Sequence, residues 1–340
     1  MIRERGRNAL DYDLRRRTQG RTDLPRLAEG MVAGQFWALY VPCGPDQRGA
    51  KRSFLAEVAL AKEVFAAYPD RFAEAFTAEE VVDAFERGRI ACLIGLEGGQ
   101  AIEGSLEALR EFRALGVRYL TLTHNCTTDW ADSALDETRH GGLSRFGIEV
   151  VREMNRLGML VDLSHTSPET MQAALDVAEA PIVWSHAGAR ALVDHPRNVP
   201  DDALARLPQN GGLAMVTFVP AFVSARHLEW DALEADARGG LPEEELHAWR
   251  EENPMPVATL ADVADHVEHI RRVAGVDHVG IGSDFDGFSR PTEGLEDVSC
   301  FPGLFAELAH RGWPDDDLAK LAGGNILRVM REAERAADRL

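Results

Sequence analysis

The chain has 340 residues, of which 45% are hydrophobic, and its formal net charge is −19. This much apolar sequence can bury a large core, and the length suits one α/β barrel as well as two smaller domains. The strongly acidic balance argues against nucleic acid or an anionic membrane surface as the main partner.

The four cysteines lie far apart and form no CxxC pair: Cys43, Cys92, Cys126 and Cys300. This spacing favours reduced thiols in a cytoplasmic protein over a disulfide framework or a zinc knuckle. No stretch approaches the roughly 18 apolar residues of a membrane span. The charged opening segment, residues 1–17, is not followed by the apolar run of a secretory signal. The sequence therefore predicts a cytoplasmic protein.

Apolar stretches that predict strands alternate with helix-like stretches from Gln35 onward. In chain order, the predicted strands lie near Trp37, Leu93, Leu120, Val161, Val183, Met215 and Ile281. Helical patterns fill the intervals, at 54–67, 79–87, 105–115, 145–157 and 168–179. A charged segment of helical pattern, residues 225–256, precedes the last predicted strand, and we expect it to be an insertion.

This alternation predicts an α/β fold, a TIM-like (β/α)8 barrel that forms a single domain over residues 1–340. Such a barrel has eight strands, whereas seven are predicted here. The place for the eighth is before Gln35, so we expect the chain to lack the first strand of the barrel.

Two of the predicted strands end in a histidine, His165 in LVDLSH and His186 in PIVWSH, 21 residues apart. Glu97, His124 and Asp284 stand at the ends of three others. Because the carboxyl ends of parallel strands meet at one mouth of a barrel, all five side chains should converge there. Imidazole with carboxylate suits zinc, and a bridging carboxylate can hold two divalent ions. One such histidine alone is more often a hydrogen-bonded structural residue, but five polar groups together favour a metal site.

Several stretches that contain these residues resemble one known family. They are TDLPRLAEGMVAGQFWALYVP, IGLEGG, RYLTLTHNC, LVDLSHTS, WSHAGARALVDHPRNVPDD and VGIGSDFDGFSRPTEGLEDVS. They resemble the membrane (renal) dipeptidases, binuclear zinc peptidases of the amidohydrolase superfamily. The likeness extends from about Thr22 to the C-terminal NILRV, nearly the whole chain. It implies a metallo-dipeptidase that hydrolyses dipeptides, including those with a C-terminal D-residue, by metal-activated hydroxide.

The resemblance implies a role for each metal-ligating residue. Glu97 would be the carboxylate that bridges two zinc ions. His165 and His186 would complete the protein ligands of the second ion.

The same resemblance implies roles toward the substrate. His124 would face the scissile carbonyl and stabilise the oxyanion. Arg197, in DHPRNVPDD, would bind the free carboxylate of the substrate, a task suited to a guanidinium fork. Asp284, rather than Asp286, would take a proton from the attacking hydroxide and pass it to the leaving amine.

The chain departs from the family at one point. Relatives open with a strand ending in His-x-Asp, which supplies two ligands to the first zinc, whereas this sequence contains no His-x-Asp and its first histidine is His124. Either the true start lies upstream of Met1, or the chain is a degenerate homologue. Such a homologue would hold one zinc or none, through Glu97, His165 and His186, and would bind peptides without turnover.

Another amidohydrolase activity on carboxylate-bearing substrates is an alternative that Arg197 does not exclude, and the family resemblance implies a homodimer. His266 and His269 lie three residues apart on a predicted helix. We interpret them as part of a solvated helix face, because no strand end supplies a third ligand beside them.

Overall fold

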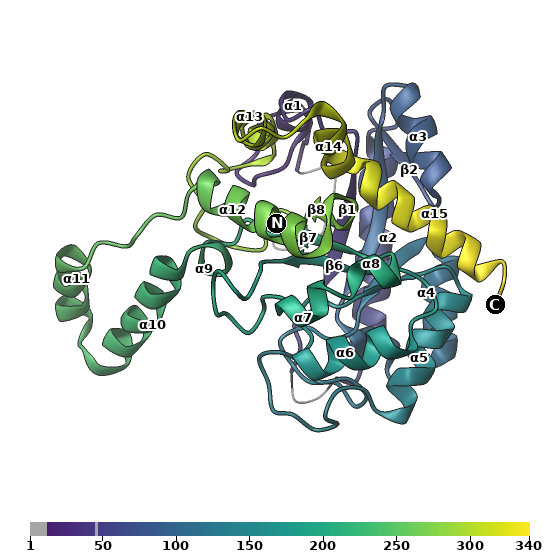
Figure 1. Cartoon of the computed structure of the whole chain (residues 1–340), viewed down its shortest axis with the longest axis horizontal. Coiled ribbons are helices and arrows are strands. Elements are labelled where there is room, and N and C mark those ends of the chain that lie inside the picture. The colour runs from purple at the N-terminus through teal and green to yellow at the C-terminus, as the bar shows by residue number, and fades with distance from the viewer. Residues whose placement is uncertain (1–11, 45–46) are drawn as a thin grey trace.

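The computed structural model describes residues 12–44 and 47–340. Its centre is one curled sheet of parallel strands (Figure 1). The strands are β1 (Gly34–Tyr40), β2 (Phe72–Glu74), β3 (Ile90–Glu97), β4 (Val117–Thr121), β5 (Leu160–Asp162), β6 (Ile182–Ala187), β7 (Leu213–Val216) and β8 (Val279–Ile281). The seven predicted strands are present, and the predicted α/β barrel class is confirmed. The short β2, which the sequence did not reveal, pairs with the first residues of β3.

The path of the sheet is β1-β3-β4-β5-β6-β7-β8, and within the described residues its two end strands do not pair with each other. Over the described residues the sheet is therefore an incomplete barrel, open between β1 and β8. The prediction that a strand is lacking before Gln35 concerns a region that includes residues 1–11, which lie outside the described residues.

The inner face of the curled sheet has an apolar lower layer. Leu93, Tyr119, Leu160, Val183 and Leu213, from five successive strands of the path, belong to one buried cluster with residues of α15. Since side chains alternate along a strand, Glu97 lies on the same face as Leu93 and nearer the carboxyl end. A Cβ on Gly95, between them, would lie 2.0 Å from the Tyr119 ring. Glycine is therefore required for that ring to fill the space below Glu97.

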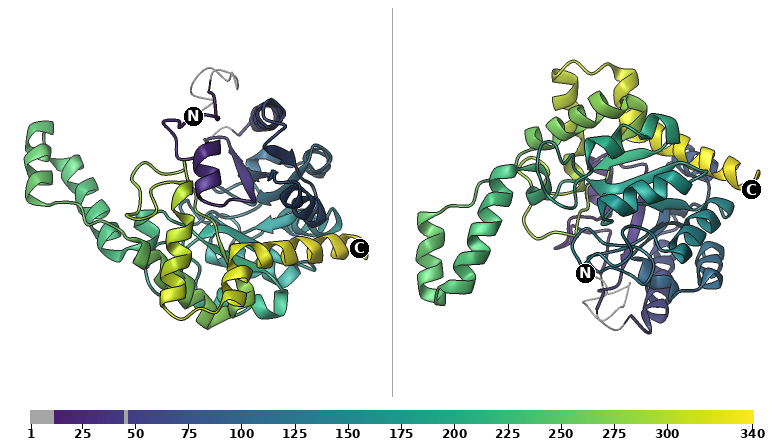
Figure 2. Two further views of the ribbon diagram at one scale, coloured as in Figure 1. Left: turned by 90° about the horizontal axis from the view of Figure 1, so that it is seen from above. Right: turned by 60° about the horizontal axis from the view of Figure 1, so that its bottom comes forward.

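Helices cover the outside of the sheet (Figure 2). They are α1 (Leu24–Glu29), α2 (Ala50–Ala67), α3 (Ala78–Glu86), α4 (Leu106–Ala114), α5 (Arg145–Arg156), α6 (Pro168–Val177), α7 (Asp201–Leu204), α8 (Leu207–Asn210), α9 (Pro220–Val223), α10 (Ala225–Gly240), α11 (Glu243–Glu252), α12 (Leu260–Ala274), α13 (Phe301–His310), α14 (Asp315–Ala319) and α15 (Asn325–Ala337). Their starts are encoded locally, since Thr77 and Thr259 form capping boxes and Ser167 caps α6 before a proline. Every helix in the described part of the chain falls short of the length and apolarity that crossing a bilayer needs.

Helix α15 closes the amino end of the sheet. Arg328 donates from Nη1 to the Gly211 carbonyl at 2.7 Å and from Nη2 to the Asp277 carbonyl at 2.8 Å, just before β7 and β8. Glu334 accepts a hydrogen bond from the Ala78 amide at 2.9 Å, at the start of α3. With one end closed in this way, the polar strand ends at the other end form the mouth.

The segment between β7 and β8 contains a helical hairpin, α10 and α11, that projects from the body (Figures 1 and 2). The two helices are joined to each other by Glu234, whose buried carboxylate pairs with Arg238 of α10 at 2.6 Å and also with Arg250 of α11. Trp230 and Trp249 pack with ring centroids 6.1 Å apart. The hairpin thus holds its form through its own contacts.

The prediction of four reduced thiols is wrong for two of them, because Cys43 and Cys126 form a disulfide. Cys92 and Cys300 are free. The bond joins the segment after β1 to the segment after β4, so it crosses the mouth of the curled sheet beside His124. A separation of 83 residues hid this contact from an argument based on spacing.

We expect protein purified without reductant and then unfolded to expose two alkylatable thiols, and four after reduction, by mass spectrometry. Because the bond closes an 83-residue loop, replacing Cys43 and Cys126 together by serine should lower the free energy of unfolding by roughly 2–4 kcal/mol. Cys300→Ser, which removes a free thiol, is the matched control and should change it little. Four labelled thiols without reductant would contradict the bond.

Candidate metal centre

The carboxyl ends of the strands deliver the predicted polar residues to one place. Glu97 is the last residue of β3, and His186 lies within β6. His124, His165 and Asp284 each follow three residues after the last residue of β4, β5 and β8. The strands are parallel and hydrogen-bonded side by side, so these positions come together at the mouth.

Glu97, His165 and His186 converge most closely. The Oε1 atom of Glu97 lies 2.8 Å from Nε2 of His165 and 3.2 Å from Nε2 of His186. The two Nε2 atoms are 3.1 Å apart. All three residues are buried, and they form the one group within the described part of the chain that could supply three or more ligands to a metal ion.

The other ring nitrogen of each histidine has a partner of its own. Nδ1 of His165 lies 3.0 Å from Oδ1 of Asn125, an acceptor, so it carries a proton. Nδ1 of His186 lies 2.9 Å from Oγ of Ser185. Metal-ligating histidines are commonly oriented in this way through the nitrogen that does not bind the ion.

With both Nδ1 atoms acting as donors, each neutral ring presents Nε2 as a lone pair. Glu97 Oε1, His165 Nε2 and His186 Nε2 are then three electron-pair donors within 3.2 Å of one another. Such a group is stable only with positive charge among its members. Two imidazoles with one carboxylate form a ligand set that zinc accepts, so the residues present fit a divalent cation.

The pKa values of the group follow the same logic. Burial alone would raise the pKa of Glu97, but its close interactions with His165 and His186 hold it well below its usual value. Desolvation lowers the pKa of His165 well below its usual value, and the Arg197 charge adds to this. Desolvation also acts on His186, but the charges of Asp284 and Glu97 outweigh it and raise its pKa. The raised pKa of His186 shows that this group of residues favours positive charge at that ring.

His124 lies beside this group as a stacked ring. Its centroid is 4.3 Å from that of His165 and 4.6 Å from that of Tyr40. Its Nδ1 atom is buried and has no hydrogen-bond partner among the described residues. Desolvation lowers its pKa, so the ring is neutral at neutral pH. A neutral imidazole can donate one hydrogen bond toward the mouth.

Asp284 and His165 share an unusual backbone, with φ of 62° and 67° in the left-handed region. Such conformations cost free energy and are concentrated at functional sites. Desolvation raises the pKa of Asp284 to about 6, with His186 acting against the rise and Glu97 adding to it. Asp286 has the same left-handed backbone, with φ of 69°, but it is exposed and accepts a hydrogen bond from the Arg21 amide at 2.9 Å.

Arg197 is the most unusual charge near the mouth. Its side chain is 1% exposed, yet none of its three guanidinium nitrogens has a hydrogen-bond partner among the described residues. The guanidinium lies 5.2 Å from the centre of the Phe222 ring. Desolvation lowers its pKa to about 10, which leaves it charged at neutral pH. A buried, unpaired cation of this kind can bind an anion, and its guanidinium fork suits carboxylate and phosphate groups.

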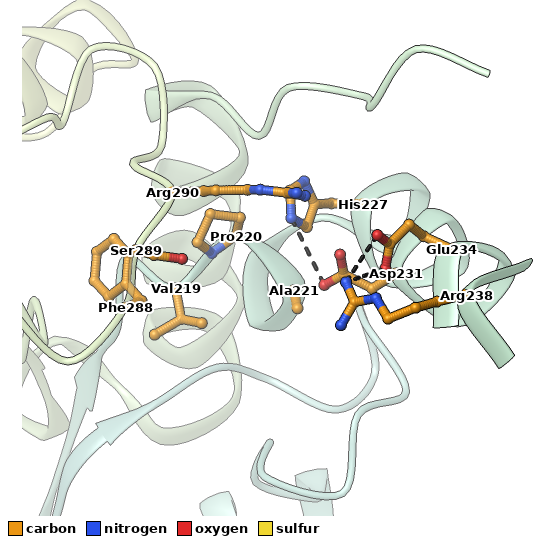
Figure 3. Close-up of a pocket in the computed structure, with 10 residues that line it drawn as sticks. All are labelled: Val219, Pro220, Ala221, His227, Asp231, Glu234, Arg238, Phe288, Ser289 and Arg290. Atoms are coloured by element: carbon orange, nitrogen blue, oxygen red, sulfur yellow. Dashed lines mark hydrogen bonds and ion pairs between the residues drawn. The ribbon is translucent and has the colours of Figure 1, made fainter. Parts of the chain in front are cut away.

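A separate cavity of about 280 Å³ lies between α9, α10 and the segment after β8 (Figure 3). Its lining includes His227, Asp231 and Arg290, and none of the strand-end residues described above. Arg238 there is already paired with Glu234 (Figure 3). We therefore place the chemistry at the mouth and not in this cavity.

The solvated face predicted for His266 and His269 is wrong, because both are buried, at 1% and 5% exposure. His266 accepts a hydrogen bond from the Ala189 amide at 2.8 Å, and His269 pairs with Asp201 at 2.7 Å. They fasten α12 to the segment after β6. Neither belongs to the group formed by Glu97, His165 and His186.

The sequence did not reveal three residues that hold the two histidines through hydrogen bonds to the ring nitrogens or to the residue that contacts them: Asn125, Ser185 and Asp162. A pattern was available, since a serine directly precedes both His165 and His186. Nothing in the sequence showed which serine would face its neighbour's ring.

Comparison with known proteins adds an independent line of evidence. The family model described as membrane dipeptidase (peptidase family M19) matches residues 2–340. Dipeptidase 3 from Mus musculus is 40% identical over 345 residues, covering 100% of this chain and 63% of the relative. Dipeptidase aclJ from Aspergillus oryzae is 41% identical over 342 residues, covering 98% and 74%. This chain thus spans less than two thirds of the length of the mouse relative.

Among solved structures, a metallo peptidase from Rhodobacter sphaeroides is similar over 98% of this chain and 95% of its own. The TM-score is 0.82 and the identity is 26%. That structure holds a phosphinate mimic of the dipeptide L-Ala-D-Ala.

Proposed function

The chain belongs to the membrane dipeptidase family, peptidase family M19, and from that premise we propose that it is a zinc-dependent dipeptidase. The observation that carries the proposal is the meeting of Glu97, His165 and His186 within 3.2 Å, beside the buried and unpaired Arg197. The first group calls for a cation and the second for an anion. A dipeptide at a metal ion satisfies both.

Glu97, His165 and His186 would hold the metal ion. When bound, a divalent ion polarises a peptide carbonyl and lowers the pKa of water. We assign zinc because nitrogen and carboxylate ligands suit it, although related ligand sets take other divalent ions.

The remaining residues would act on the substrate. Arg197 would bind the free carboxylate of the dipeptide through its guanidinium fork. His124 would donate a hydrogen bond to the carbonyl oxygen as that oxygen gains charge. The pKa of Asp284 is raised to about 6. The carboxylate is therefore ionised at neutral pH, and its pKa is near enough to neutral pH for it to accept and release a proton during the reaction. It would therefore take a proton from water and give it to the leaving amine.

The substrate class follows from the relatives. The Rhodobacter sphaeroides structure was solved with a mimic of a dipeptide that ends in a D-residue, which supports tolerance of such dipeptides by this chain. Two alternatives from the sequence, a non-catalytic homologue and a different amidohydrolase, find no support in the names of the relatives given above.

The disulfide bears on where the protein is located. The cytoplasmic location was expected from reduced thiols, and the Cys43–Cys126 bond removes that ground, because disulfides persist in oxidising compartments. We therefore favour an oxidising compartment. A homodimer is proposed from the family resemblance alone.

Metal removal tests the function directly. A chelator should abolish hydrolysis of a panel of dipeptides, L-Ala-D-Ala among them, and added zinc should restore it. His165→Ala should lose metal and turnover together, whereas Asp284→Asn should keep the metal and lose turnover by roughly 10²–10⁴-fold. Zinc content and initial rates are the measurements. Zinc bound without turnover of any dipeptide would favour the non-catalytic homologue, and turnover that survives chelation would refute the metal.

Arg197→Ala should lower kcat/KM for dipeptides by roughly 10–100-fold, because a charged hydrogen bond contributes about 1.5–3 kcal/mol. The wild-type enzyme should lose about as much on dipeptides with an amidated C-terminus, and the variant should not distinguish the two substrates. Arg206→Ala is the matched control, since Arg206 is paired with Asp176 away from the mouth. An Arg197 variant that still prefers the free carboxylate would rule out this role.

A further inference from the structure

A chain of buried hydrogen bonds runs behind His186. Nδ1 of His186 is 2.9 Å from Oγ of Ser185, and that Oγ is 2.6 Å from Oδ2 of Asp162 on the neighbouring strand β5. Asp162 is 0% exposed, and Ser185 and His186 are also buried. The three residues thus form a line that leads from the metal centre into the barrel wall.

The two carboxylate oxygens of Asp162 have different partners. Oδ1 accepts two backbone amides, from Ser164 at 3.1 Å and from Ser185 at 2.8 Å. Oδ2 accepts two hydroxyls, from Thr121 at 2.5 Å and from Ser185 at 2.6 Å. Four donors occupy both oxygens, so the carboxylate acts only as an acceptor here.

This arrangement determines the direction of every proton in the line. A serine hydroxyl has one proton, and that of Ser185 goes to the charged Oδ2 of Asp162 at 2.6 Å in preference to Oγ of Ser164 at 3.2 Å. Oγ of Ser185 can then only accept from His186, so Nδ1 of His186 must carry the proton. Nε2 is left as a lone pair that faces Glu97 at 3.2 Å.

We infer that Asp162 is a positioning residue, which acts through Ser185 to hold His186 in the tautomer that can bind a metal ion. In calling His186 a ligand, the inference rests on the proposed function. His165 has a simpler arrangement, because its Nδ1 meets the side chain of Asn125, an exposed residue, directly. The two histidines are therefore held by different means, and only His186 depends on a buried carboxylate.

Asp162→Asn is a sharp test because the backbone dictates how the amide must lie. Oδ1 has to face the amides of Ser164 and Ser185, so the NH2 group must take the place of Oδ2. It then donates to Oγ of Ser185, and the serine proton turns to Nδ1 of His186 at 2.9 Å, which is a nearer and stronger acceptor than Oγ of Ser164 at 3.2 Å. The proton of His186 must move to Nε2, where it faces Glu97 and blocks the metal.

The first readout needs no metal. Nitrogen NMR of histidine-labelled, metal-free protein at alkaline pH, where the ring is neutral, should show Nδ1–H for His186 in the wild type and Nε2–H in Asp162→Asn. The second readout is zinc affinity by competition with a chelator, which should fall roughly 10–100-fold in Asp162→Asn. Because the tautomer is measured without zinc, failure of the proposed function would leave this test intact.

Ser185→Ala breaks the line and serves as a second variant. In that background, adding Asp162→Asn should not weaken zinc further, because the serine that transmits the change is gone. Asp132→Asn is the matched control: Asp132 is also 0% exposed and accepts only backbone amides, from Arg139, His140 and Gly142. It should lower thermal stability without changing the tautomer of His186.

Two results would overturn the inference. One is Nδ1–H on His186 in Asp162→Asn, or Nε2–H in the wild type. The other is an equal loss of zinc affinity from Asp162→Asn with and without Ser185, which would mean a general structural effect. If Asp162→Asn does not fold, Ser185→Ala alone decides, since it should give a mixture of tautomers in place of one.

Discussion

The structure depends on the meeting of three electron-pair donors at the mouth of a curled sheet. Glu97 Oε1 and the Nε2 atoms of His165 and His186 lie within 3.2 Å of one another, an arrangement that repels itself without a positive charge. A bound divalent ion would supply that charge. Arg197 lacks the complementary charge, because no described residue bonds to its buried guanidinium. A cation among the three donors and an anion at Arg197 are what the proposed binding of a carboxylate-bearing dipeptide at a metal ion would supply.

The fold brings these electron-pair donors together and holds them in place. Parallel strands bring their carboxyl ends together, and His165 and Asp284 adopt left-handed backbone conformations just beyond two of these ends. Below Glu97, the Tyr119 ring fills the space that Gly95 leaves open, and α15 closes the far end through Arg328 and Glu334. The apolar floor keeps water away from the polar layer above it, which strengthens the electrostatic interactions there.

Much of this was predictable from the sequence, for identifiable reasons. Buried parallel strands are continuous apolar runs, so β3 and β6 were found together with the polar residue that each delivers, Glu97 and His186. What failed depended on contacts between distant segments. The Cys43–Cys126 bond spans 83 residues, and His266 is buried because the Ala189 amide meets it from another segment. The line from Asp162 through Ser185 depends on the register of β5 against β6, which no local pattern reveals.

The binding of zinc by Glu97, His165 and His186 can be tested in crystals soaked with zinc and measured at the zinc absorption edge, because anomalous scattering locates the ion without assumptions about activity. We expect an anomalous peak within bonding distance of Glu97 Oε1, His165 Nε2 and His186 Nε2, and its loss in Glu97→Ala. The absence of a peak there, or a peak that persists in Glu97→Ala, would contradict this expectation.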